Sequence, residues 1–108
     1  MSYKIEISPN FKKEAKRFNK KYRSLKKDLK ELFESLAQNP TQGTPLGHHV
    51  YKIRLAIRSK GKGKSGGARV ISYVFVKNQT VLLLSTYDKS NKVTISDKEI
   101  KALIKRFT

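Results

Sequence analysis

The sequence contains no cysteine, which excludes disulfides, thiolate nucleophiles and cysteine-based zinc sites. No apolar run is long enough to cross a membrane, and the first residues, MSYKIEIS, lack the apolar stretch of a secretory signal. From these absences we expect a soluble, cytoplasmic protein with no membrane partner. A chain of 108 residues supports one modest core, so we expect a single domain over residues 1–108.

Acidic residues are missing from the middle of the chain. There is no Asp or Glu between Ser35 and Tyr87, whereas residues 39–78 contain eight basic residues, and the formal net charge of the whole chain is +17. A positive field without internal counter-ions is tolerated best when an external polyanion supplies the missing charge. Nucleic acid is the most common such partner, so the charge pattern predicts RNA or DNA binding.

The N-terminal third is also basic, but its charges follow a different pattern. Residues 1–38 contain eleven basic and five acidic residues. Four of the acids are interleaved with the lysines at helical spacing: Glu14, Asp28, Glu31 and Glu34. Neighbouring opposite charges on a helix partly neutralise each other, and this pattern is typical of an ordinary solvated helix face.

Hydrophobic periodicity predicts a strand and two helices in the N-terminal part. Residues 3–7 alternate between apolar and polar side chains, as a half-buried strand does. Residues 11–22 and 25–36 each carry an apolar stripe at helical spacing, and Pro40 ends the second stripe. Ser8-Pro9 supplies an N-cap hydroxyl followed by proline at the first helical position. We therefore expect a strand followed by a helical hairpin.

The rest of the chain is mostly strand-like. Residues 40–49 are expected to form a loop, because they are rich in proline and glycine. Apolar and β-branched segments predict three strands, at 50–57, 68–76 and 81–87. A capping box of Ser96 and Glu99 then starts a last helix. The order β-α-α-β-β-β-α predicts an α+β fold, with a small, mainly antiparallel sheet packed on the helical hairpin and a C-terminal helix.

A cluster of cations is expected on one face of this sheet. Side chains alternate along a strand, so Lys52 and Arg54 share one face while Ile53 and Leu55 point to the helices. Arg69 on the neighbouring strand is within reach of them, and neither strand contains an acidic residue. Three such cations would bind phosphate, and their mutual repulsion favours a neutral lysine that can act as a general base. The alternative is a merely solvated strand face.

Two connecting segments are further candidates. The loop at 59–67 contains four glycines and is long for a simple turn, so we interpret it as a flexible basic finger that contacts a phosphate backbone. A merely solvated hairpin loop is equally compatible with its composition. The candidate phosphate-binding residues are Arg58, Lys60, Lys62 and Lys64. His48-His49 has no acidic residue nearby in sequence, so we expect a solvated loop there and no metal site.

The chain resembles the RelE/ParE superfamily of small bacterial toxins, and is closest to its RelE and HigB branches. The resemblance rests on the element order, the segment 51–55, the KGKGK-x-GG-x-R loop before the third strand, and the segment LLSTYDK at 83–89. It implies the toxin of a toxin–antitoxin pair that inhibits translation as a ribosome-dependent endoribonuclease of messenger RNA. Such enzymes need no metal or other cofactor, and align the ribose 2′-hydroxyl for attack on the adjacent phosphate.

The resemblance also implies roles for individual residues. Lys52 is the candidate base or charge stabiliser, and Arg69 matches the arginine that stabilises the transition state. Arg54 stands where lysine is common, and because arginine stays protonated it should only bind phosphate. Tyr87 and Lys89 are candidates for base stacking and for the acid. Some relatives use a tyrosine near the C-terminus or a histidine after the last strand, and this chain has neither, so the acid stays open.

Two other functions remain compatible with the same sequence. The superfamily contains gyrase inhibitors of the ParE kind, and a basic protein of this size can also bind RNA without cleaving it. The resemblance also implies that the protein has an antitoxin partner. The net charge of +17 suggests that the contacting segment of that partner is acidic, and that it covers the sheet face or displaces the last helix.

Overall fold

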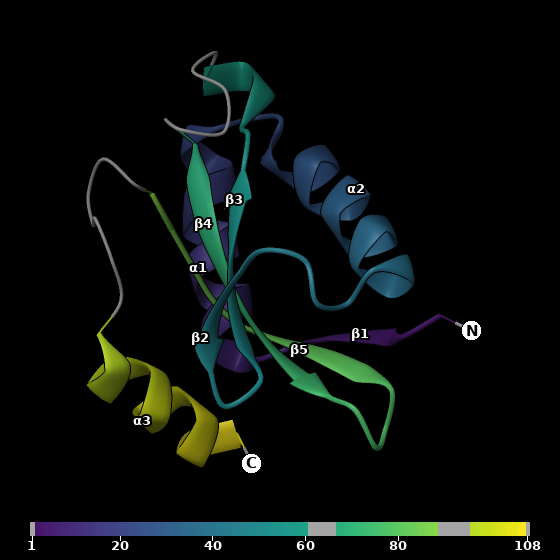
Figure 1. The fold of residues 1–108 in the computed structure, drawn as a ribbon. Coiled ribbons are helices and arrows are strands. Elements are labelled where there is room, and N and C mark those ends of the chain that lie inside the picture. Colours follow the sequence, from purple (N-terminus) through teal and green to yellow (C-terminus); the bar gives the residue numbers. More distant parts are fainter. Residues whose placement is uncertain (1, 61–66, 89–95, 108) are drawn as a thin grey trace.

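The computed structural model describes residues 2–60, 67–88 and 96–107 (Figure 1). Its elements in chain order are β1 (Lys4–Ile7), α1 (Pro9–Lys21), α2 (Leu25–Gln38), β2 (Thr44–Gly47), β3 (Val50–Leu55), a short 3-10 helix η1 (Arg58–Lys60), β4 (Ala68–Phe75), β5 (Thr80–Asp88) and α3 (Asp97–Phe107). The strands form one sheet in the order β1-β5-β4-β3-β2. Only the β1–β5 pair is parallel within this sheet, so the expected α+β fold with a mainly antiparallel sheet is confirmed.

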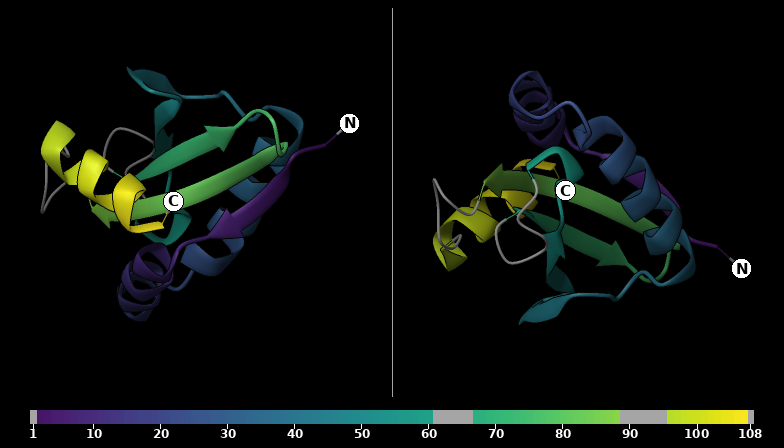
Figure 2. Two further views of the ribbon diagram at one scale, coloured as in Figure 1. Left: turned by 90° about the horizontal axis from the view of Figure 1, so that it is seen from below. Right: turned by 90° about the horizontal axis from the view of Figure 1, so that it is seen from above.

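The sheet lies between two helical layers. Figure 2 shows α1 and α2 on one side of the sheet and α3 on the other. Side chains of β3 and β4 alternate between the two layers: Ile53 and Val70 pack with the helical hairpin, whereas Val50 and Ile71 pack with α3. This alternation is the expected consequence of the two-residue period of a strand. The two faces of the sheet therefore have separate cores.

The core under α1 and α2 is the larger of the two. Pro9 is at the start of α1, and the Ser8 hydroxyl caps the helix by accepting a hydrogen bond from the Phe11 backbone N–H at 3.0 Å. The same hydroxyl donates to the Leu84 carbonyl at 3.2 Å, which ties the start of α1 to β5. The buried side chains that the two helices contribute are Phe11, Phe18, Leu25, Leu29, Leu32 and Leu36.

The core under α3 is smaller. Ile100 is buried there, while Leu103 and Ile104 are partly buried against the same cluster. The predicted capping box is confirmed, because the Ser96 hydroxyl accepts a hydrogen bond from the Glu99 backbone N–H at 3.1 Å. Among the side chains of α3 that the structure describes, only Ile100 is fully buried, so this helix is held by less apolar contact than α1 or α2.

The prediction of a loop over residues 40–49 was wrong for its second half. Residues Thr44–Gly47 form β2, which pairs antiparallel with β3 and places Pro45 opposite Tyr51. The strand is at the edge of the sheet, where a proline without a backbone N–H is tolerated. The connecting turn takes His48 and His49 to positive φ angles of 53° and 66°. Proline and glycine signals hid this strand because they are also the usual signals of a loop.

The glycine at position 67, directly before β4, is required by a close approach of two backbone segments. A Cβ atom at this position would lie 2.1 Å from the backbone carbonyl oxygen of Leu55. Real Cβ atoms do not approach that closely, so any side chain must push the start of β4 away from the end of β3. The absence of a side chain at Gly67 therefore lets two strands approach where the candidate site begins.

We expect Gly67→Ala to lower the free energy of unfolding by about 3 kcal/mol, at the upper end of the cost of overpacking, because the obstructing atom belongs to the backbone. Denaturant unfolding followed by circular dichroism measures this change. Gly47→Ala is the control: its Cβ meets no atom within 4 Å, so only the strain of a positive φ remains, worth about 1–2 kcal/mol. Equal stability of Gly67→Ala and the wild type would contradict the close approach.

Within the described part of the chain, no helix has both the length and the apolar character that a membrane span requires.

Candidate functional site

Four of the residues singled out from the sequence come together on the α3 face of the sheet. Arg54 of β3 lies directly opposite Arg69 of β4, and Arg69 lies directly opposite Tyr87 of β5. Lys52 is two residues before Arg54 on the same face, opposite Ile71. Directly opposed residues on neighbouring strands have Cβ atoms only about 5 Å apart. We call Lys52, Arg54 and Arg69 the cation row; it ends at Tyr87.

The cation row places like charges side by side. Opposed like charges on neighbouring strands destabilise a sheet, so the direct pairing of Arg54 with Arg69 has a cost that a bound anion would remove. In the described part of the chain, Lys52 and Arg54 take part in no ion pair within 4.0 Å. A dianionic or polyanionic ligand such as phosphate fits this arrangement, because it can contact several fixed cations at once.

Arg69 is the most enclosed member of the row. Its exposed fraction is 4 %, whereas Arg54 is exposed and Lys52 is half-buried. One guanidinium nitrogen, Nη1, donates a hydrogen bond to the Ala68 carbonyl oxygen at 3.2 Å. A buried arginine is already oriented and partly desolvated, so its interaction with a nearby anion is stronger than that of a solvated one.

Tyr87 is buried beside Arg69, in the cluster that contains Ile100 of α3. Burial raises the pKa of its phenol above the ordinary value, the charge of Arg69 acts to lower it, and the carboxylate of Glu99 acts to raise it. The phenol therefore stays protonated at neutral pH. Tyr87 can donate a hydrogen bond or a proton but cannot act as a general base there, and base stacking requires that its ring first become exposed.

Glu99 is a member of this neighbourhood that the sequence interpretation missed. It was assigned only to the capping box, yet its charge also acts on the Tyr87 phenol across the α3 face of the sheet. No local pattern could indicate this, because the distance between the two residues depends on how α3 packs on the sheet. The site thus combines three basic residues with a carboxylate from the covering helix.

Arg58 lies against α2, and it lines one pocket together with Arg54 of the cation row. Its guanidinium forms an ion pair with Glu31, and its Nε is 3.8 Å from Oδ1 of buried Asp28. Its backbone N–H donates to the other Asp28 oxygen at 3.2 Å. These contacts attach η1 to α2, so the Arg58 charge is largely compensated within the protein. Its predicted role in phosphate binding stays a prediction.

The remaining predicted residues are not placed. Lys62, Lys64 and Lys89 lie outside the described residues, and of Lys60 only the backbone is described, at the end of η1. The proposed basic finger at residues 59–67 therefore stays a sequence-based prediction.

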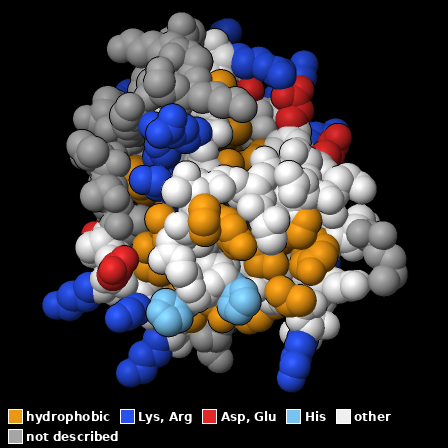
Figure 3. All heavy atoms as spheres, viewed as in Figure 1, with side chains coloured by type: hydrophobic (Ala, Val, Ile, Leu, Met, Phe, Trp, Pro, Cys, Tyr) orange, Lys and Arg blue, Asp and Glu red, His pale blue; other side chains and the backbone are white. Residues whose placement is uncertain are grey.

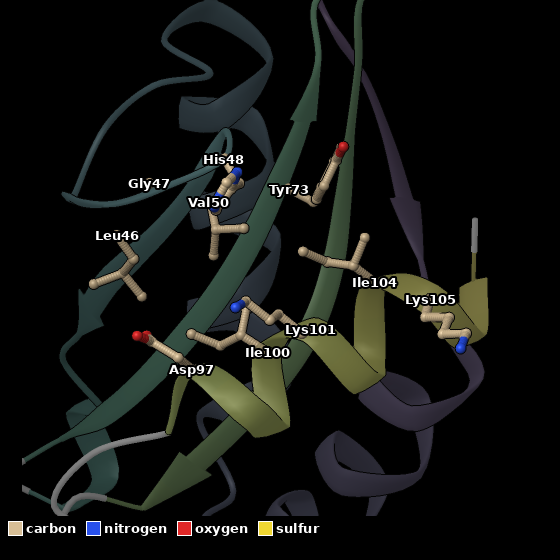
Figure 4. A pocket seen from close by; sticks show the side chains of 10 residues that line it. All are labelled: Leu46, Gly47, His48, Val50, Tyr73, Asp97, Ile100, Lys101, Ile104 and Lys105. Atoms are coloured by element: carbon tan, nitrogen blue, oxygen red, sulfur yellow. The ribbon is translucent and has the colours of Figure 1, made fainter.

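One groove, of about 520 Å³, lies beside the site rather than within it (Figure 4). Val50 and Tyr73 of the sheet face Ile100 and Ile104 of α3 across it, and His48 closes it from the β2–β3 turn. Figure 3 shows the two histidines at the surface beside hydrophobic side chains. They were expected in a solvated loop, and both are exposed. Within the described ranges, no three potential metal-ligating side chains come close enough to hold an ion.

Comparison with known protein families shows which family the chain belongs to. A sequence model of the RelE family, described as the RelE toxin of the RelE/RelB toxin–antitoxin system, matches residues 10–107. The protein belongs to the RelE toxin family. The match includes every strand of the sheet except β1, and hence the whole cation row.

Solved RelE structures share the fold of this RelE-family toxin. A double mutant of the Escherichia coli RelE toxin in the free state is 17% identical, with a TM-score of 0.64 over 100% of both chains. The toxin–antitoxin complex RelBE2 of Mycobacterium tuberculosis is matched at 15% identity and a TM-score of 0.60, over 82% of this chain and 92% of that one. The intact Escherichia coli RelBE complex is matched at 22% identity and a TM-score of 0.51, over 81% and 96%. No curated protein sequence matches the chain.

Proposed function

We propose that this RelE-family toxin is a ribosome-dependent endoribonuclease that cleaves messenger RNA in the decoding site and thereby stops translation. It would act in the cytoplasm as one toxin domain over residues 1–108. The observation that supports the proposal is the pairing of Arg54 with Arg69, and of Arg69 with Tyr87, across three neighbouring strands. Lys52 on the same face completes the set of groups that cleavage by a neighbouring hydroxyl requires.

The chemistry follows from these groups. The ribose 2′-oxygen attacks the adjacent phosphorus while the bond from phosphorus to the 5′-oxygen breaks, which leaves a 2′,3′-cyclic phosphate and a free 5′-hydroxyl. In our proposal Lys52 either accepts the proton of the 2′-hydroxyl or stabilises the charge that develops on the phosphate. Arg54 holds the phosphate in position, and Arg69 stabilises the pentacovalent transition state.

The leaving 5′-oxygen needs a proton, and two residues remain candidates to supply it. Tyr87 is protonated at neutral pH because burial raises the pKa of its phenol, and it adjoins Arg69. Lys89 is the alternative acid or phosphate contact, two residues further along the chain. Because Arg69 and Tyr87 are 4% and 7% exposed, the groups that cover them must move before RNA reaches them. Only then could the Tyr87 ring stack on a base.

Primer extension on messenger RNA after brief induction of the toxin tests the proposed function. We expect new 5′ ends within translated codons, and no such ends when ribosomes are kept off the message. A DNA damage response without new ends would instead indicate a gyrase inhibitor. Salt-dependent RNA binding without new ends under any condition would indicate a non-catalytic RNA-binding protein.

We further propose that an acidic segment of a cognate antitoxin inhibits the toxin, either by covering the cation row or by displacing α3. Two of the structurally similar proteins are toxin–antitoxin complexes. The net charge of +17 and the small apolar contact of α3 support the same idea. Co-expression with the adjacent open reading frame should yield a complex and restore growth, and failure of both would contradict the proposal.

A further inference from the structure

A pocket of about 250 Å³ between α2 and the end of β3 brings acidic and basic side chains together. Arg54 of the cation row and Arg58 of η1 line it together with Asp28 and Glu31 of α2. Residues 39–78 contain no acid of their own, so α2 supplies the counter-charges for this end of the row. The formal charges of the two arginines and the two acids in the pocket balance.

The two acids are held very differently, and Asp28 is a fixed part of the fold. Its side chain is 2 % exposed. Its Oδ2 accepts hydrogen bonds from the Ser24 hydroxyl at 2.7 Å and from the Arg58 backbone N–H at 3.2 Å. Next to it, the Ser59 backbone N–H donates to the Ser24 oxygen at 2.9 Å. These contacts hold the backbone of η1 against α2 without any help from the Arg58 side chain.

Glu31, in contrast, binds only the mobile end of Arg58. Its carboxylate forms an ion pair with the Nη2 group of the guanidinium, and the two side chains are 48 % and 58 % exposed. An ion pair between exposed side chains contributes little to stability, because both ions are well solvated and both long side chains lose conformational freedom. A competing anion can therefore break this pair while the Asp28 contacts keep η1 in place.

The ion pair was not expected from the sequence. Asp28 and Glu31 were predicted to neutralise the lysines beside them on the helix, and this prediction is wrong because both acids contact Arg58 instead. Arg54 lines the same pocket but takes part in no ion pair within 4.0 Å among the described residues. A phosphate that binds Arg54 from this pocket therefore meets a second guanidinium, which a carboxylate already occupies.

We propose that Glu31 is an internal competitor of the substrate phosphate: it binds Arg58 in the free protein, and a phosphate of the message at Arg54 displaces it. Carboxylate and phosphate compete for Arg58 because the guanidinium binds either of them through the same parallel N–H groups. After the exchange, Arg54 and Arg58 hold one phosphate between them. The inference rests on the proposed binding of messenger RNA at the cation row and adds a residue that regulates its affinity.

The exchange requires the movement of one side chain only. The backbone N–H of Arg58 can stay bonded to Asp28 while the guanidinium turns from Glu31 to the phosphate. Glu31 itself contacts neither the substrate nor the reacting atoms, so its effect is on binding and not on the chemical step. Removing its charge should thus make binding tighter, the opposite of what the loss of a substrate contact does.

The test is a titration of the full-length protein with a trinucleotide built from 2′-deoxyribonucleotides, which lacks the attacking hydroxyl and cannot be cleaved. Nuclear magnetic resonance of the guanidinium Nε–H groups reports on Arg54 and Arg58 separately. In the wild type we expect both signals to change with the same midpoint, because one phosphate binds both side chains. The midpoint gives the affinity of this site even when the ligand also binds elsewhere.

Glu31→Gln should tighten binding at this site by roughly two- to fivefold, which corresponds to an exposed ion pair of up to about 1 kcal/mol. Glu34→Gln is the matched control, because it removes the same charge from an exposed residue three positions further along α2. Its affinity should stay within about 1.3-fold of the wild type. In an Arg58→Gln background, Glu31→Gln should change nothing, because the competitor acts through Arg58 alone.

Three results would overturn the inference. In the first, the Arg54 signal responds to the trinucleotide and the Arg58 signal does not. In the second, Glu31→Gln and Glu34→Gln tighten binding equally, so that net charge explains the effect. In the third, Glu31→Gln has its full effect without Arg58. A lack of response at both arginines would contradict the phosphate site itself. Since the ligand cannot be cleaved, a failure of the proposed endoribonuclease activity would not alter any of these outcomes.

Discussion

Replacing Arg69 by alanine is expected to lower the rate of messenger RNA cleavage at saturating ribosome by about 100- to 1,000-fold, the usual cost of losing one fixed donor to a transition-state charge. The arginine is buried between Arg54 and Tyr87, so its guanidinium is oriented before the substrate arrives. Its contact with the phosphate tightens as negative charge develops on the equatorial oxygens. The loss should therefore appear in the rate rather than in the affinity for the ribosome.

Single-turnover cleavage on programmed ribosomes measures this effect. Arg23→Ala is the matched control, because it removes an exposed arginine from the α1–α2 turn, and its saturated rate should be unchanged. Circular dichroism should be used to check that Arg69→Ala is folded. Arg69→Lys keeps the charge without the planar fork and should recover only part of the rate. In cells, Arg69→Ala and Lys52→Ala should relieve growth arrest. A saturated rate within about threefold of the wild type for Arg69→Ala would show that the site is assigned wrongly.

The second large effect is expected in binding and not in chemistry. Replacing Lys60, Lys62 and Lys64 by serine should weaken ribosome binding and reduce its salt dependence, by up to roughly one counterion for each lost phosphate contact. The saturated cleavage rate should barely change, because a contact that is equally strong in the ground state and the transition state affects apparent affinity alone. Titration in ribosome at two salt concentrations gives both quantities.

The control for net charge is Lys98→Gln, Lys101→Gln and Lys105→Gln, which removes three exposed charges from α3 instead. It should retain more ribosome affinity than the serine variant. A large fall in the saturated rate of the serine variant would contradict this division of roles and would place residues 60–64 within the active site itself.

The cation row could be predicted from the sequence because its determinants are local. The alternation of Lys52 and Arg54 with Ile53 and Leu55 fixes which side chains share a face, whatever else the chain does. The absence of acidic residues on the two strands can likewise be read directly from the sequence. The sequence predicted only that Arg69 is within reach of these residues; its direct pairing with Arg54 depends also on the register between β3 and β4.

Features that depend on long-range packing could not be predicted. The partners of Asp28 and Glu31 come from around residue 58, and the partners of Glu14 include β5, more than seventy residues away. Without these contacts the acids seemed to neutralise the lysines beside them in sequence. The burial of Arg69 and the influence of Glu99 on Tyr87 depend on how the sheet and α3 pack, which has no local signature.

The most direct test of the central proposal is to incubate the purified protein with messenger RNA on programmed ribosomes and to determine the chemistry of the product ends. We expect cleavage within the codon in the decoding site, with a 2′,3′-cyclic phosphate on one fragment and a 5′-hydroxyl on the other. The same message without ribosomes should stay intact, as should message on ribosomes treated with Arg69→Ala on the same time scale. Intact message on ribosomes with the wild-type protein, or ends that carry a 5′-phosphate, would contradict cleavage by the neighbouring 2′-hydroxyl at the cation row.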